Sequence, residues 1–241
     1  MRVPAIFGAL ARAIPILFSG RIVALATLPL LTAVVVWLAI AIAAWAPLTG
    51  ALADLFGARP AEASLWQRVA ADVIAALIFM ALAAASAFAA IAILAMPVIV
   101  RTVAARDFPA LAARRGGSFV GSARNATLAL LIFVPLWLLS LPLLVFPPAY
   151  AVASLLLNAW LAQRMFRYDA LAEHASVDEI AMVLARNRGE LMGLGLALSP
   201  LSLVPLVNIL VLPIYAGIAF AELCLGELAA VRGRSGVAAA A

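Results

Sequence analysis

Charged residues are scarce in this sequence. Only 11% of its 241 residues are charged and 68% are hydrophobic, whereas about a quarter of the residues in an ordinary soluble domain are charged. A soluble domain of this length could bury a good core, but its surface would need more charge than this chain carries. The composition therefore excludes an ordinary soluble protein and indicates a polytopic membrane protein.

Cysteine and histidine occur once each, and this excludes several kinds of site. Cys224 alone can form neither an intrachain disulfide nor a multi-cysteine metal site. His174 has no second histidine at the spacing of a metalloprotease helix, and no glycine-rich nucleotide-binding motif occurs. Scattered carboxylates supply no paired catalytic geometry. We therefore expect no enzymatic activity, no metal site and no cofactor.

Lysine is absent, so all sixteen basic residues are arginine and the net charge is +5. In a membrane protein, topology and anionic lipid explain such a charge better than nucleic acid does. The expected partner is therefore the lipid bilayer, and no nucleic-acid partner is expected.

Two uncharged runs, 22–48 and 73–100, are each long enough to cross the ~30 Å hydrocarbon core as a helix. Two others, 125–163 and 191–221, are too long for a single crossing. Prolines interrupt both of these longer runs, at Pro147 and Pro148 in "LPLLVFPPAYA" and at Pro200, Pro205 and Pro213 in "SPLSLVPLVNILVLPIYA". Because proline ends one helix and can open the next, we predict helical hairpins over 125–163 and 191–231. Several of their arms are shorter than the membrane core, so the hairpins either cross fully or penetrate only part of it.

The remaining segments complete an all-α integral membrane protein with a single membrane domain over residues 1–241. Residues 1–21 are predicted to form an amphipathic segment at the interface. Residues 164–190 are predicted to form a cytoplasmic connector, in which Ser176 and Glu179 start a helix through a capping box and Gly189 stops it.

Arginine distribution predicts the orientation of the chain. The N-terminal segment, the segment between the second and third runs, the connector and the C-terminal tail are all rich in arginine. The positive-inside rule places these segments, and hence both termini, in the cytoplasm. Glu222 and Glu227 are the only candidates for intramembrane ionisable residues, and both fall close to the cytoplasmic end of the last helix, so we predict no proton relay.

A glycine–arginine stretch, "ARRGGSFVGSARN", allows two interpretations. Arg114 and Arg115 beside Gly116 and Gly117 could form an anion-binding nest ahead of a helix that starts near Ser122. A loop that enforces topology or touches anionic lipid explains the same residues, and we prefer this second interpretation.

Several stretches together resemble the CysZ sulfate-permease and etoposide-induced-protein superfamily of membrane proteins. They are "NAWLAQRMFRYDALAEHAS", "VPLVNILVLPIYAGIA" and, near the start, "SGRIVALATLPLL". The likeness covers nearly the whole chain, and "RYDALAEHAS" and "RRGGSFVGS" are closer to a bacterial branch than to proven sulfate permeases. The resemblance implies two long transmembrane helices, two pairs of hemi-penetrating helices and a place in the bacterial inner membrane.

The resemblance also implies a function and a site. The function is passive transport of sulfate or another small anion, and the alternative is a non-transporting membrane scaffold or accessory protein. The superfamily's sulfate site maps here onto Gly20 and Arg21, while Ile22 stands where the superfamily has a second arginine. Arg21 could instead be an interfacial anchor that sets topology. We further expect the chain to form a homo-oligomer.

Overall fold

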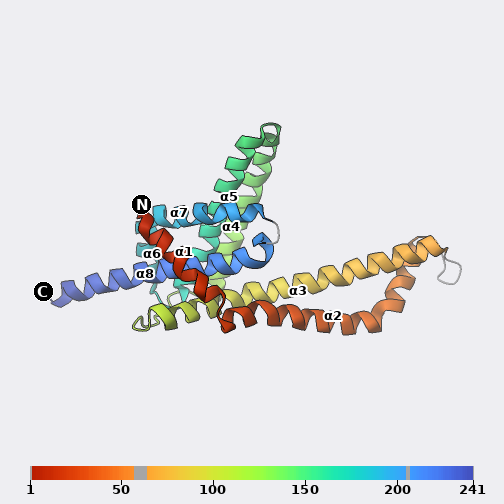
Figure 1. Cartoon of the computed structure of the whole chain (residues 1–241), viewed down its shortest axis with the longest axis horizontal. Coiled ribbons are helices and arrows are strands. Elements are labelled where there is room, and N and C mark those ends of the chain that lie inside the picture. Colours follow the sequence, from red (N-terminus) through yellow and green to blue (C-terminus); the bar gives the residue numbers. More distant parts are fainter. Residues whose placement is uncertain (1, 57–63, 205–206, 241) are drawn as a thin grey trace. The chain divides into compact units, whose positions relative to one another are not determined.

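The computed structural model describes residues 2–56, 64–204 and 207–240, and the regular structure in these ranges is entirely helical. The predicted all-α fold is thus confirmed (Figure 1). Pro205, one of the predicted break points, lies outside the described residues. The chain falls into two units, Met1–Ile22 with Ala95–Ala241 and Val23–Leu94, which are described separately below.

Unit Val23–Leu94 is a pair of long helices, formed by most of α2 (Gly20–Leu55) and the first part of α3 (Leu65–Asp107). Both helices extend beyond the runs 22–48 and 73–100 at each end. The charged residues that bound those runs lie within the helices, since charged side chains do not interrupt backbone hydrogen bonding.

Aromatic side chains join α2 to α3. The indole Nε1 of Trp37 donates to Ser86 Oγ at 2.9 Å, and Trp45 stacks on Phe79 with ring centroids 6.1 Å apart. The indole Nε1 of Trp45 also donates to Asp72 at 3.2 Å. Polar and ring contacts therefore supplement apolar packing along this pair.

The first predicted hairpin is present in the larger unit. α4 (Phe119–Ser140) leads through a 3₁₀ turn, η1 (Leu141–Val145), into α5 (Pro147–Ala172), and α4 and α5 pack along each other (Figure 1). The proline pair occupies the first turn of α5, where a missing N–H costs no hydrogen bond. α4 begins before the predicted Ser122, because the Ser118 hydroxyl accepts from the Gly121 N–H at 3.0 Å and caps the helix.

The connector between the hairpins contains the last turns of α5, the whole of α6 (Val177–Arg186) and the start of α7 (Arg188–Leu198). The predicted capping box at the start of α6 is confirmed. The predicted stop at Gly189 is wrong, because α6 ends two residues earlier. Asn187 directs both its backbone N–H and its side-chain Nδ2 to the Val183 carbonyl, at 3.1 and 2.9 Å, and Gly189 falls in the first turn of α7.

The second hairpin continues from α7 through η2 (Ser199–Leu203) and a π-helical turn, η3 (Val207–Val211), into α8 (Leu212–Ala240). α8 is the central helix of the larger unit and packs against α1 (Val3–Leu17), α5 and α7. The buried face of α1 is formed by Ile6, Ala9, Ala13 and Ile16. Small residues on this face let α1 pack closely on α8.

Four described helices are long and apolar enough to cross a membrane: Gly20–Leu55, Leu65–Ala87, Val120–Val145 and Leu212–Gly233. Within the first three spans only 11–17% of residues are buried by protein, whereas 78% are buried in the last. Apolar surfaces of this size are not stable in water. The chain is therefore a membrane protein, with α8 in the protein core.

Candidate functional site

Gly20 and Arg21 lie at the start of α2, directly after the turn that ends α1. The Ile22 N–H donates to the Ser19 carbonyl at 3.0 Å, which closes the first turn. A Cβ built on Gly20 would meet no atom within 4 Å, and the Arg21 side chain is exposed. Among the described residues, Arg21 has no ion pair. An unpaired guanidinium therefore lies beside open space at a helix N-terminus.

Ile22, by contrast, points into the protein and is only 1% exposed. The position where the superfamily has its second arginine is therefore a core position in this chain. Any anion at this turn would be held by one guanidinium and the backbone N–H groups of the first turn of α2. Anion binding at Gly20 and Arg21 itself stays a prediction.

The anion-nest interpretation of residues 114–117 is wrong. The backbone N–H groups of Arg115, Gly116 and Gly117 donate to the carbonyls of Glu173, Ala175 and Ala172, at 3.0, 2.8 and 2.9 Å respectively. These donors satisfy the carbonyls left open at the C-terminal end of α5, so they are not available to an anion. Arg115 adopts a left-handed φ of 48°, which allows the successive N–H groups to face α5.

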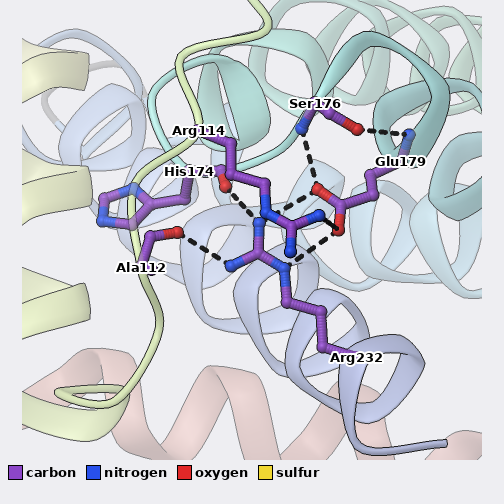
Figure 2. A network of polar contacts seen from close by, with 6 residues as sticks. All are labelled: Ala112, Arg114, His174, Ser176, Glu179 and Arg232. Atoms are coloured by element: carbon purple, nitrogen blue, oxygen red, sulfur yellow. Dashed lines mark hydrogen bonds and ion pairs between the residues drawn. The ribbon is translucent and has the colours of Figure 1, made fainter. Parts of the chain in front are cut away.

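The loop between α3 and α4, residues 108–118, and the start of α6 are joined to α8 by a hydrogen-bonded network around Glu179 (Figure 2). Arg232 binds both Glu179 oxygens, through Nε at 3.0 Å and Nη2 at 2.9 Å, and also donates to the carbonyls of Ala112 and His174. Arg114 adds a hydrogen bond to Glu179 at 2.9 Å. The hydrogen bonds from Arg232 are the main cause that lowers the pKa of Glu179 to about 2. The network joins three segments that are far apart in the sequence.

His174 is buried beside this network, and its backbone carbonyl accepts from Arg232 at 2.6 Å. Burial lowers the pKa of its imidazole. Among the described residues no three potential metal ligands come together. The hydrogen bond from Arg232 to its backbone carbonyl thus gives His174 a structural role.

Glu222 and Glu227 are buried in α8, and each forms an ion pair with an arginine of the N-terminal segment. Arg12 Nε lies 2.8 Å from Glu222 Oε2, and Arg2 Nη2 lies 2.6 Å from Glu227 Oε2. The side chain of Glu222 is completely covered. The sequence indicates these two carboxylates but not their partners, because nothing in a single sequence shows that α1 packs on α8.

A pocket of about 250 Å³ lies between α5 and the turns of the second hairpin. Most of its lining is apolar, but Asn158, Ser199, Ser202 and Asn208 contribute polar groups. Asn158 Nδ2 lies 3.5 Å from Ser202 Oγ. The sequence does not show these four residues as a set, because they become neighbours only when the hairpin packs on α5.

Comparison with known proteins gives one family. The family model described as Sulfate transporter CysZ/Etoposide-induced protein 2.4 matches residues 9–213, from α1 to the beginning of α8, and includes Gly20 and Arg21. Searches of curated proteins and of solved structures give no match. The match covers far more than half of the chain, and the chain therefore belongs to the Sulfate transporter CysZ/Etoposide-induced protein 2.4 family.

Proposed function

We propose that this protein is a passive permease for sulfate or a similar small oxyanion in a bacterial inner membrane. The observation that carries the proposal is the exposed, unpaired Arg21 beside the open space at Gly20, in a family named for sulfate transport. The exposed guanidinium offers a planar pair of donors that suits a tetrahedral oxyanion. Gly20 allows close approach because it has no Cβ.

Polar groups between α5 and the second hairpin support a permeation path. Asn158, Ser202 and Asn208 line a pocket beside non-α-helical turns. Irregular backbone at membrane depth is stable only when it is buried in protein or faces a water-filled cavity. Transport is proposed to be passive because the sequence has no nucleotide-binding motif and because arginines hold both buried carboxylates of α8.

Arg21→Lys tests the proposed entry site, because lysine keeps the positive charge but loses the planar fork. One charge-assisted hydrogen bond contributes ~1.5–3 kcal/mol, so we expect sulfate affinity to fall roughly 10- to 100-fold. The measurement is release of radiolabelled sulfate from proteoliposomes over a range of sulfate concentrations. Arg124→Lys, at another exposed arginine, is the matched control and should behave like the parent.

Two results would count against this site. If Arg21→Lys inserts correctly and transports sulfate as the parent does, Arg21 is a topology anchor. If the parent itself leaves the vesicles tight, the alternative function, a non-transporting membrane scaffold, is favoured.

The proposed orientation, with both termini in the cytoplasm, can be tested by cysteine labelling. Leu65 and Ala113 are both exposed, and the proposed topology puts them on opposite sides of the membrane, at the start of α3 and after its end. In intact cells an impermeant maleimide should label Leu65→Cys, whereas Ala113→Cys should react only after permeabilisation. The parent is the control, since its single Cys224 is buried and should stay unlabelled. The reverse pattern would overturn the orientation, and external labelling of both variants would indicate dual insertion.

A further inference from the structure

Three arginines line a second pocket, whose lining includes neither Gly20 nor Arg21. Arg164 and Arg167 are one turn apart on α5, and Arg188 is the first residue of α7. They line a pocket of about 510 Å³ together with Trp160, Gln163 and residues of α6. Residues three apart on a helix share a face, so the sequence itself places the first two guanidiniums together, and packing of α7 on α5 adds the third.

Within the described part of the chain, no carboxylate lies within ion-pair distance of these three arginines, although five other arginines of the same unit each pair with a glutamate. Those five are Arg2, Arg12, Arg101, Arg114 and Arg232. The three arginines of the pocket thus lie close together without a neighbouring carboxylate to balance their charge in the described chain.

Two of the guanidiniums also carry buried donors without a partner. The Nε–H groups of Arg164 and Arg167 are both buried and donate to no hydrogen-bond acceptor in the described chain. Burial, together with the like charges of Arg164 and Arg188, lowers the pKa of Arg167. Burying an unpaired donor is unfavourable, and more so when it is charged. An acceptor with several negative oxygens would remove this cost for both groups.

The geometry of the pocket suits an anion that enters from outside. Arg188 is exposed at its edge, whereas Gln163 is buried deeper on α5. The Arg164 guanidinium lies 5.9 Å from the centre of the Trp160 ring. An arginine that lies over an aromatic ring keeps the donors at its edge available for hydrogen bonds.

We propose that the pocket between α5, α6 and α7 binds a tetrahedral oxyanion of the phosphate or sulfate class through Arg164, Arg167 and Arg188. Two sources share this chemistry, a free inorganic anion and the phosphate of an anionic lipid headgroup. The site does not depend on the proposed transport function, because its residues are separate from the proposed entry site.

Binding is measured on the full-length protein, purified in detergent and stripped of lipid, by isothermal titration with sodium sulfate and sodium phosphate against sodium chloride at matched ionic strength. An Arg21→Gln background removes any contribution from the proposed entry site. We expect Arg167→Gln and Arg188→Gln each to weaken oxyanion binding at least about tenfold. Arg186→Gln, at an exposed arginine of α6 outside the pocket, should leave it unchanged.

A second arm identifies the source of the anion. Before lipid is stripped, native mass spectrometry of a phosphatidylglycerol-containing preparation should show one retained lipid if the headgroup is the occupant. That lipid should be lost in Arg167→Gln and Arg188→Gln. If no lipid is retained and the stripped protein binds sulfate or phosphate, the occupant is a free anion.

Arg188→Gln keeps the test decisive if Arg167→Gln does not fold, since Arg188 lies at the exposed edge of the pocket. The proposal is overturned if neither inorganic anion nor phosphatidylglycerol binding depends on Arg167 or Arg188. If the protein does not transport sulfate but this pocket still binds the oxyanion, the result counts only against the permease function.

Discussion

Glu179→Ala is expected to lower the stability of the protein by about 3 kcal/mol, the lower end of the cost of removing one partner of a buried ion pair, because Glu179 and Arg232 are partly buried. Glu179 is 13% exposed and receives hydrogen bonds from Arg232, Arg114 and the Ser176 N–H. Without it, Arg232 keeps its backbone acceptors but loses its counter-charge. The start of α6 would also lose its capping box.

Thermal unfolding in detergent measures this loss. For a chain of this size, 1 kcal/mol corresponds to a change in Tm of about 2–4 °C, so we expect a decrease of roughly 10 °C. Asp178→Ala is the matched control, because Asp178 is an exposed neighbour in the same helical turn and contributes only ~0.3–1 kcal/mol through the helix dipole. Equal Tm values for the two variants would show that the Glu179 network does not stabilise the protein.

The same network predicts a pH dependence. The pKa of Glu179 is about 2 in the folded protein and 4.5 is its ordinary value. Because the folded pKa is the lower one, the stabilisation is fully present above pH 4.5 and is lost as the pH falls from there toward 2. The Tm difference between the parent and Glu179→Gln should therefore shrink over this interval. A constant difference would mean that the charge of Glu179 is not responsible.

Gly117→Val is expected to disrupt the contact between the loop and α5. A Cβ at Gly117 would lie 2.4 Å from the Cβ and 2.5 Å from the Cα of Ala172, so the backbone itself must move. The move would break the hydrogen bond from the Gly117 N–H to the Ala172 carbonyl. Overpacking costs typically about 1–3 kcal/mol, and loss of this hydrogen bond adds about 1 kcal/mol.

Gly226→Ala on α8 is the control for this substitution. Its new Cβ would meet Phe108 at 3.6 Å, an ordinary contact, and alanine is favoured over glycine within a helix. We expect a Tm at or slightly above that of the parent for Gly226→Ala, and a Tm several degrees lower for Gly117→Val. If Gly117→Val unfolds at the parent's temperature, the loop does not pack on α5 in this way.

Local signals in the sequence predicted the elements of this fold well. Pro147 and Pro148 marked the start of α5, and Ser176 with Glu179 marked the start of α6, because proline and capping residues act on their own neighbours in the chain. The Gly189 stop failed for a local reason too, since Asn187 ended the helix first.

Contacts between distant segments could not be predicted in the same way. The pairing of Arg12 with Glu222 depends on how α1 packs on α8, and the role of Gly117 depends on the end of α5. Arg164, Arg167 and Arg188 were counted as charges that set topology, although they surround one pocket. The number of charges in a segment predicts on which side of the membrane it lies, but it does not show which of these charges form ion pairs.

Passive anion permeation is tested most directly by current across a planar bilayer that contains the purified protein, with potassium sulfate at different concentrations on the two sides. The proposal predicts a current without ATP or a proton gradient, with a reversal potential near the equilibrium potential of sulfate. It also predicts that Arg21→Lys reduces this current. A reversal potential near that of potassium, or no current from correctly inserted protein, would contradict it.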